Sequence, residues 1–294
     1  MVLKIQNLAG IINAKLINNP QISQIEGFCF EASKAKRGEC FFATNELEAK
    51  LAVKNGAYAI VGDIEPFDDE VAFLRINDAK TAILRLIRYF ITANDLIVLN
   101  VTASQAAVLS LFCADFTLCK SKLENILKHA ISAKTKVLAI KEAPKDLSFQ
   151  SQSLTEVKSI KSSSLSLFFS DFAYNGIRYS LALPSIFVGE FCAILAFFYN
   201  KNIEFSIKDF KDFDSFKPVF VGHKNQLVAS SNRAFICVKD AEIFEFCTRR
   251  LDAPAFSSLS EPKSLEFEKF ALINCDYKEL CEKLKVEKIE ESLF

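Results

Sequence analysis

Glycine is the residue that most restricts what this chain can fold into. The sequence of 294 residues contains only eight glycines, at positions 10, 27, 38, 56, 62, 176, 189 and 222. The stretch 63–175 therefore contains none. A phosphate-binding loop between a strand and a helix depends on glycine, because a residue without a Cβ lets backbone N–H groups approach and surround an anion. The sequence predicts that 63–175 contains no glycine-rich phosphate loop.

The charge balance and the apolar content indicate a packed globular protein. Half of the residues are apolar, and Lys plus Arg equals Asp plus Glu at 36 each. A length of this size corresponds to roughly two domains. The zero formal charge gives no reason to expect nucleic acid or an anionic membrane as a partner. The nine cysteines contain no CxxC pair, which predicts reduced, mostly buried thiols and no metal site.

The chain ends and the apolar stretches predict a cytoplasmic protein without a membrane span. The first seven residues lack the charged-then-apolar pattern of a secretory leader. The apolar stretches 107–119 and 186–199 are each interrupted by an acidic residue and are too short to cross a bilayer. The carboxy-terminal segment 276–294 is rich in Lys and Glu, which predicts an exposed helix that could serve as a partner surface.

Short apolar runs alternate with polar turns over 25–80, which predicts a small α/β unit. The expected strands are 28–30, 39–43, 57–61 and 71–76, and the expected helix is 46–55, ended by Gly56. Asn77 or Asp78 is expected to cap a second helix.

The rest of the chain continues the alternation with weaker signals. We expect strands at 96–101, 137–140, 234–238 and 270–274, helices at 121–130, 186–200, 206–213, 240–250 and 276–286, and a hairpin formed by 165–169 and 178–183. The segment 108–116 is consistent with either a helix or a buried strand. The Ser- and Lys-rich segment 143–164 is expected to be a loop or linker.

Three strings in the first 80 residues carry a resemblance to a known family. They are EASKAKRGECFFA at 31–43, AVKNGAYAIV at 52–61 and IND at 76–78. In order and spacing they resemble the first domain of the Mur ligases, most like the D-alanyl-D-alanine-adding (MurF-like) members. The resemblance implies an α/β fold with a Mur-ligase-type amino-terminal domain over 1–79. It also implies a reduced Rossmann-like central domain over 80–220 and a truncated α/β carboxy-terminal region over 221–294.

The resemblance continues into the position of the family's ATP phosphate loop. The strand at 97–101 is followed by Thr102-Ala103-Ser104-Gln105-Ala106-Ala107-Val108, where the family has TGSNGKT. Alanines replace both glycines and the lysine, and Val108 replaces the threonine that would hold Mg²⁺. Backbone wrapping, the positive charge and the metal ligand are therefore all lost. The string predicts an ordinary apolar strand-to-helix junction, with no cofactor, no metal and no catalytic residue.

A second group of residues concerns nucleotide-sugar binding. Glu31, Ala32 and Ser33 stand where the family has the Asp-Ser-Arg triplet that contributes to recognition of the UDP group. The residues Ser33, Lys34, Thr44 and Asn45 still offer polar groups around the same turn. Two interpretations stay open here, a retained UDP-sugar pocket and a solvated turn.

The two histidines do not suggest catalysis. His129 is expected at a helix surface or carboxy-terminal cap, and His223 in a turn, and no Ser-His-Asp or Cys-His order can be assembled. The resemblance implies a catalytically inactive Mur-ligase-like protein that binds a cell-wall synthesis protein or a UDP-MurNAc-peptide precursor in peptidoglycan synthesis. The alternatives are an active UDP-MurNAc-peptide ligase with a rebuilt ATP site and a purely structural interaction protein.

Overall fold

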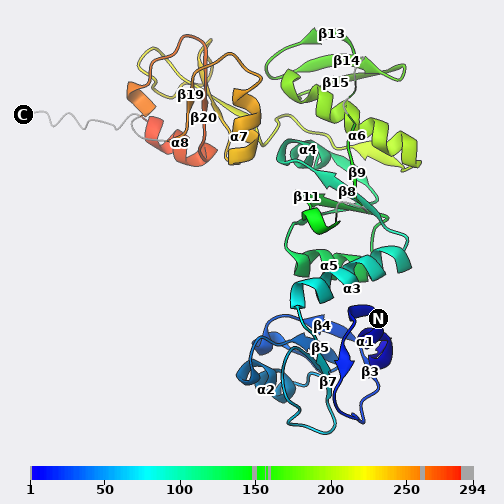
Figure 1. Cartoon of the computed structure of the whole chain (residues 1–294). Coiled ribbons are helices and arrows are strands. Elements are labelled where there is room, and N and C mark those ends of the chain that lie inside the picture. The colour runs from blue at the N-terminus through cyan, green and yellow to red at the C-terminus, as the bar shows by residue number, and fades with distance from the viewer. Residues whose placement is uncertain (1, 148–150, 156, 158–159, 259–261, 286–294) are drawn as a thin grey trace, which may run out of the picture. The chain divides into compact units, whose positions relative to one another are not determined.

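The computed structural model describes residues 2–147, 151–155, 157, 160–258 and 262–285. The chain divides into two compact units, each with mixed α/β structure (Figure 1). Unit 1 consists of Met1–Asn100 and Phe116–Gln152, and unit 2 of Val101–Asp115 and Ser153–Phe294. The expected α/β class is confirmed. The three domains implied by the resemblance to Mur ligases, with boundaries at 79/80 and 220/221, stay a prediction.

The first sheet of unit 1 contains the strands expected over 25–80 and one further strand, β2, that was not expected. Its strand order is β2 (Lys15–Leu16), β7 (Ala72–Arg75), β6 (Ala59–Val61), β5 (Glu39–Phe42) and β4 (Gly27–Cys29). The strands β4 to β7 are parallel, and β2 adds an antiparallel edge. Helix α2 (Glu46–Lys54) begins where the Asn45 side chain accepts a hydrogen bond from the Glu48 N–H at 2.9 Å. The predicted strands and the predicted helix are confirmed, and each observed end lies within two residues of the expected one.

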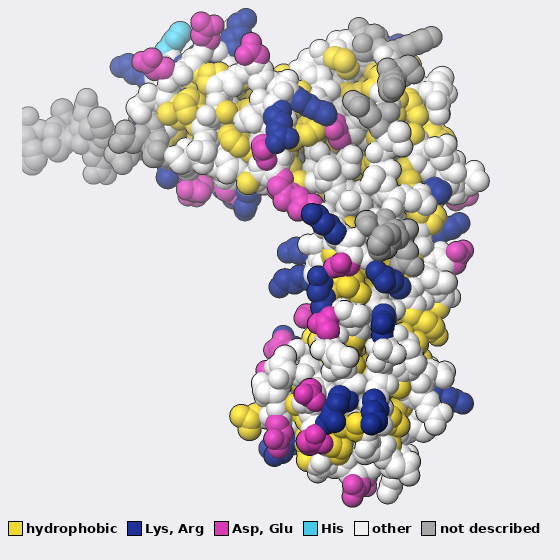
Figure 2. Space-filling model, in the orientation of Figure 1, with side chains coloured by type: hydrophobic (Ala, Val, Ile, Leu, Met, Phe, Trp, Pro, Cys, Tyr) yellow, Lys and Arg dark blue, Asp and Glu magenta, His cyan; other side chains and the backbone are white. Residues whose placement is uncertain are grey.

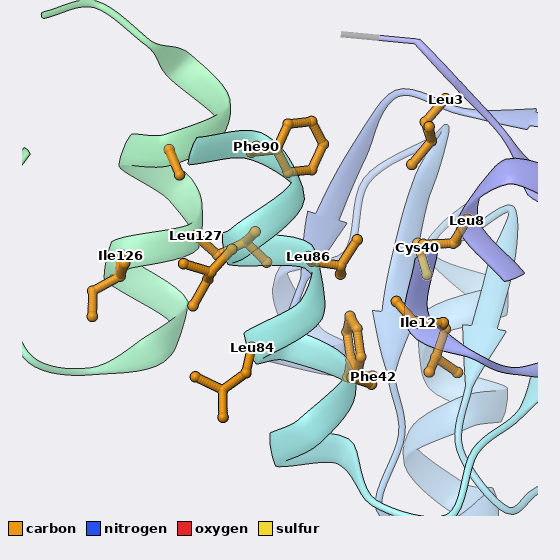
Figure 3. Packing of buried hydrophobic residues seen from close by; sticks show 14 of the residues in the cluster. Leu3, Leu8, Ile12, Cys40, Phe42, Leu84, Leu86, Phe90, Ile126 and Leu127 are labelled. Atoms are coloured by element: carbon orange, nitrogen blue, oxygen red, sulfur yellow. The ribbon is translucent and has the colours of Figure 1, made fainter. Parts of the chain in front are cut away.

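The second sheet of unit 1 has the order β10 (Phe116–Lys120), β11 (Val137–Lys141), β8 (Ile97–Val101) and β12 (Ser151–Ser153). Helices α3 (Ala79–Ala93) and α5 (Leu123–Ser132) pack against each other, and α3 also contacts α1 (Ile5–Ile12). Figure 3 shows Leu86 and Phe90 of α3 between α5 and the first sheet, in one continuous core. The core residues Leu8, Leu86 and Ile126 are fully buried, so the two sheets of unit 1 share their apolar packing.

The first part of unit 2 combines two packed helices with a two-stranded sheet. Helix α4 (Ala103–Leu109) packs against α6 (Val188–Lys201), and β9 (Phe112–Ala114) pairs with β16 (Phe205–Ile207). A separate antiparallel sheet is formed by β13 (Lys161–Leu165), β14 (Ser170–Tyr174) and β15 (Ile177–Leu181). The β14–β15 turn is made by Asn175 and Gly176, both with positive φ, which a two-residue hairpin loop of this type requires.

The remainder of unit 2 is a four-stranded sheet with two helices. Its strand order is β17 (Lys217–Phe220), β18 (Ala234–Cys237), β20 (Phe270–Ile273) and β19 (Ala255–Phe256). Helix α7 (Ala241–Thr248) follows β18, and helix α8 (Tyr277–Leu284) follows β20. Leu280 and Leu284 of α8 are buried, so this helix is amphipathic and not exposed all round. The part of the expected helical segment at 286–294 lies outside the described residues.

Three expectations are wrong in detail. No helix forms over 206–213, because Phe205–Ile207 pairs with β9, a partner about 90 residues earlier in the chain. The segment 143–164 is not only a linker, since it contains β12 and the start of β13; its residues 148–150, 156 and 158–159 lie outside the description. Of the expected first hairpin strand at 165–169, Leu165 is the last residue of β13 and 166–169 connects β13 to β14, which is the strand that pairs with β15. Among the described residues, no helix is both long and apolar enough to cross a membrane.

Candidate functional site

The junction between β8 and α4 is where a Mur ligase resemblance would locate phosphate binding. Strand β8 ends at Val101, and α4 begins at Ala103, so a single residue separates them. Thr102 is that residue, and its hydroxyl accepts a hydrogen bond from the Gln105 N–H at 3.3 Å. A second hydrogen bond joins the same two residues, in which the Gln105 Oε1 accepts from the Thr102 N–H at 3.0 Å. The two contacts form a capping box, which satisfies polar groups at the helix start from within the chain.

The side chains after Thr102 turn into the protein interior. Ala103, Ser104 and Ala106 are buried, and Val108 is fully buried. The Ser104 hydroxyl lies 3.0 Å from the Thr102 hydroxyl, so its polar group is bonded locally. The outer face of the junction consists of the exposed Thr102 and the half-buried Gln105 and Ala107. The seven residues from 102 to 108 therefore form a cap and two helical turns, and no loop stands between strand and helix.

The packing of α4 explains why this local sequence is helical and apolar. The helix contacts α6 and α7, and its Val108 and Leu109 have no exposed surface. A Thr at 108 would bring a hydroxyl into this contact, and burying a hydroxyl without a partner costs about 1–3 kcal/mol. The residues that would replace a phosphate loop are thus part of the core of unit 2.

The second group of candidate residues lies at the carboxyl edge of the first sheet. The turn after β4 contains the short 3₁₀ helix η1 (Ala32–Lys34), preceded by Glu31. The Ser33 hydroxyl donates to one Glu31 carboxylate oxygen at 3.1 Å, and the Lys34 ammonium pairs with the other at 2.6 Å. The hydrogen bond from Lys34, and next that from Ser33, lowers the pKa of Glu31 below its usual value. Both predicted residues are exposed and already share one carboxylate.

The turn after β5 contributes Thr44 and Asn45 from the neighbouring parallel strand. The Thr44 hydroxyl donates to the Glu48 carboxylate at 2.6 Å. The Asn45 amide nitrogen donates to the Thr44 hydroxyl at 3.2 Å, while its carbonyl oxygen caps α2. Helix α2 contacts η1, and the Asn55 side chain donates to the Ala32 carbonyl at 2.9 Å. The two turns with the four predicted polar residues therefore belong to one edge of one sheet.

A third contribution to this edge comes from Arg75, which was not predicted from the sequence. Arg75, the last residue of β7, has its Nε 3.0 Å from an Asp63 carboxylate oxygen and also pairs with Glu65. Parallel strands end on the same side, so these residues stand on the edge that carries Lys34 and Asn45. A Cβ at Gly62 would lie 2.7 Å from the Ala43 carbonyl oxygen, so this close approach requires glycine. The Gly62-Asp63 pair directly after a buried strand was the available sequence signal.

Histidine and metal chemistry find no support in the described part of the chain. His129 is half-buried in the last turn of α5, and burial, followed by Lys128, lowers its pKa. His223 is an exposed turn residue, as expected. Within residues 2–285, apart from the undescribed gaps, no group of three or more His, Cys, Asp or Glu side chains could hold a metal ion.

Acidic and basic side chains occur together on the face of the molecule drawn in Figure 2.

The cavities in the structure lie beside other residues. One open cavity of about 630 Å³ at the amino-terminal edge of the first sheet is lined by Arg37, Lys54, Tyr58 and Glu70 among others. Another of about 630 Å³ borders β17 and α8, and a third of about 420 Å³ lies near the start of β20. None of these three cavities is lined by a residue of 102–108 or by the four predicted polar residues.

Comparison with known proteins adds the fold assignment. No protein-family model and no curated protein matches the sequence. A crystal structure of MurF from Acinetobacter baumannii aligns with a TM-score of 0.57 at 12% identity, covering 97% of this chain and 88% of that one. A second crystal structure of the same protein gives 0.56 at 11% identity, covering 96% and 87%. The chain therefore has the α/β fold of a Mur ligase, similar to that of MurF.

Proposed function

We propose that this MurF-like chain performs no phosphoryl transfer and acts by binding in peptidoglycan synthesis. The observation that carries the proposal is the β8–α4 junction, where a capping box and buried alanines stand at the position that the sequence resemblance assigns to a phosphate loop. The ligand or partner is a UDP-MurNAc-peptide precursor or a protein of cell-wall synthesis. All nine cysteines are free thiols, which supports a cytoplasmic place of action, where such thiols stay reduced.

ATP with Mg²⁺ does not fit the residues of this junction. Phosphoryl transfer relies almost entirely on positioning and on charge stabilisation by backbone N–H groups, a lysine and metal ions. Here the Gln105 N–H is bonded by the Thr102 hydroxyl and the Ala106 N–H by the Thr102 carbonyl at 2.8 Å. No residue from 102 to 108 is positively charged, and the hydroxyl that would ligate the metal is replaced by the buried Val108.

The carboxyl edge of the first sheet supports the binding part of the proposal. Lys34 is 73% exposed in its side chain and pairs with the exposed Glu31. A surface pair of this kind contributes about 0–1 kcal/mol, so an anionic ligand can displace Glu31 at small cost. Thr44 and Asn45 add hydroxyl and amide groups from the neighbouring turn. A nucleotide-sugar carries phosphate and hydroxyl groups, with which cationic and neutral donors of this kind can form hydrogen bonds.

The test is an assay of ATP consumption with UDP-MurNAc peptides. The full chain is incubated with ATP, Mg²⁺, a UDP-MurNAc peptide and either amino acids or D-alanyl-D-alanine, beside an active ligase and a mock preparation. We expect ATP consumption no greater than in the mock preparation. Consumption above that level would overturn the proposal and favour a ligase with a rebuilt ATP site.

A melting experiment separates precursor binding from a purely structural role. A rise of the melting temperature with UDP-MurNAc peptide, and none with ATP-Mg²⁺, is the expected result. If neither compound changes the melting temperature, precursor binding is wrong, and the protein partner is sought by affinity purification from its own cells.

A further inference from the structure

Two cysteine side chains meet at the carboxyl edge of the sheet formed by β17, β18, β20 and β19. Cys237 is the last residue of β18, and Cys275 comes two residues after the end of β20. Their sulfur atoms are 3.8 Å apart. Both side chains are buried, with 3% and 8% of their surface exposed. The pair plays no part in the proposed function, which concerns unit 1 and the start of α4.

The backbone brings these sulfurs together through a local turn. Strands β18 and β20 are parallel neighbours, and Cys237 stands opposite Ile273. The Cys275 N–H donates to the Ile273 carbonyl at 3.1 Å, which folds the chain around Asn274. This turn brings Cys275 back toward Cys237, although Cys275 lies two residues beyond Ile273, the strand partner of Cys237. The sulfur contact is therefore a consequence of strand register and turn geometry.

Two further interactions hold the same strand ends together. The Asn274 amide donates to the Val238 carbonyl at 2.8 Å, and the Lys239 ammonium pairs with Asp276 at 2.9 Å. Both bridges connect the end of β18 with the end of β20, on the residues next to the cysteines. A covalent bond between the sulfurs would therefore join two segments that already stay in contact, with a shortening of the sulfur distance to about 2 Å.

The proximity of the thiols also changes their acidity. A hydrogen bond between the sulfurs favours one thiolate and disfavours the second, because a single proton is shared. It lowers the pKa of Cys275, whereas the same hydrogen bond, together with burial, raises the pKa of Cys237 far above its usual value. Cys275, which is also the more exposed of the two, is the better nucleophile of the pair. Metal binding is no alternative, since no third ligand completes a cluster among the described residues.

We propose that Cys237 and Cys275 are an oxidation site at which a hydroperoxide forms an intrachain disulfide. The Cys275 thiolate attacks one peroxide oxygen, the O–O bond breaks, and hydroxide leaves, so that Cys275 becomes a sulfenic acid. The Cys237 sulfur then attacks the Cys275 sulfur, the S–O bond breaks, and the departing hydroxide takes up the Cys237 proton. The sum is two thiols and hydrogen peroxide giving one disulfide and two waters.

The disulfide would close a loop that contains α7 and β19. It would tie the start of α7, which follows Cys237, to the start of α8, which follows Cys275. Such a cross-link restricts the unfolded chain more than the folded one. We therefore expect the oxidised protein to melt several degrees higher than the reduced protein, and the shift to disappear after reduction by a dithiol.

The experiment maps disulfides in the full chain after treatment with hydrogen peroxide. The reduced protein is exposed to peroxide, remaining thiols are alkylated, and the digest is analysed by mass spectrometry without reduction. The expected result is one dominant linked pair of peptides, containing Cys237 and Cys275. Isolated oxidation of these cysteines without a link would overturn the proposal, as would a dominant link to Cys281, the partly exposed cysteine of α8.

Variants sharpen the assignment. Cys237→Ser and Cys275→Ser should each abolish both the linked peptide and the rise in melting temperature. Cys247→Ser, at a fully buried cysteine of α7, is the matched control and should retain both. The peptide map of the unmodified sequence decides the proposal even where a serine variant fails to fold. A rise in melting temperature that persists in Cys275→Ser would count against it.

Discussion

The β8–α4 junction and the carboxyl edge of the first sheet differ in what their polar groups are bonded to. At the junction, the Thr102 and Gln105 side chains satisfy the backbone of the helix start, and the following residues are packed against α6 and α7. At the sheet edge, the exposed Lys34 and Thr44 bond to the carboxylates of Glu31, which is exposed, and Glu48, which is half-buried. The first set belongs to the internal structure of unit 2, while the second is open to solvent.

This difference shows that two regions of one fold can differ in how readily their polar groups change partners. Polar side chains that bond to exposed carboxylates can exchange those partners for a ligand, because the free energy of a surface pair is small. Backbone groups enclosed in a capped helix cannot make that exchange without unfolding the first turn. A binding function at the sheet edge is therefore compatible with the proposed absence of phosphoryl transfer at the junction.

Introducing the Mur ligase phosphate-loop residues at 103–108 is the change that we expect to have the largest effect. The combined substitution Ala103→Gly, Ala106→Gly, Ala107→Lys and Val108→Thr should lower the free energy of unfolding by about 3–5 kcal/mol. Glycine in a helix costs about 1 kcal/mol relative to alanine, and the buried hydroxyl at 108 adds about 1–3 kcal/mol. Urea unfolding measures the loss, and titration with ATP-Mg²⁺ should give no binding.

Ala107→Lys alone is the control for that variant. Position 107 is half-buried on the outer side of α4, so its long side chain can reach solvent, and we expect a change within about 0.5 kcal/mol. A combined variant as stable as the original protein, with ATP-dependent stabilisation, would show that the junction keeps a phosphate-loop geometry. The comparison between the two regions would then fail.

Removal of the helix cap at the junction is the next change in order of size. Thr102→Ala should reduce the free energy of unfolding by about 1 kcal/mol, because the Gln105 N–H loses its acceptor. Thr102→Ser keeps the hydroxyl and should restore most of the stability. Thermal or urea unfolding measures both. Equal stability of the alanine and serine variants would contradict the capping role.

The fold of the first 80 residues was predictable because local signals there agree with one another. Buried runs such as 39–43 and 57–61 lie between turn residues, and Asn45 and Asp78 mark helix starts by their side chains. Helix α1 was missed because its start has no side-chain cap, and it is held by burial of Leu8 and Ile12 against other elements. The strand at 205–207 was missed because its pairing partner is remote in sequence.

The candidate site was predictable only in part for the same reason. Thr102 followed by Gln105 is a recognisable capping pattern, and the absence of glycine was visible in the sequence. The role of Arg75 depends on the parallel register of β6 and β7, which brings it to Asp63. No local pattern encodes that distance, so this part of the sheet edge required the three-dimensional structure.

At the sheet edge we expect a small effect on stability but a clear effect on ligand binding. Lys34→Ala should change the free energy of unfolding by less than about 0.5 kcal/mol, since its pair with Glu31 is exposed. It should weaken binding of a UDP-MurNAc peptide roughly tenfold, because a charge-assisted hydrogen bond is lost. Calorimetric titration measures the affinity. Lys283→Ala, at a comparable surface pair in α8, is the control, and equal affinity of both variants would exclude Lys34 as a contact.

The smallest expected effect is a difference in pH dependence between the cap of α3, Asp78, and the cap of α4, Thr102. Hydrogen bonds from Thr81 lower the pKa of Asp78, so its folded pKa lies below its unfolded pKa. The stability that the Asp78 carboxylate contributes is complete above the unfolded pKa and is lost as the pH falls through the folded pKa. Asp78→Asn keeps an acceptor without a titrating charge, so it should flatten the fall of melting temperature between about pH 5 and pH 2. Thr102 does not titrate, so Thr102→Ala should lower the melting temperature by a similar amount at every pH. If the melting temperature of Asp78→Asn fell with decreasing pH as steeply as that of the original protein, the two caps would not differ in this way.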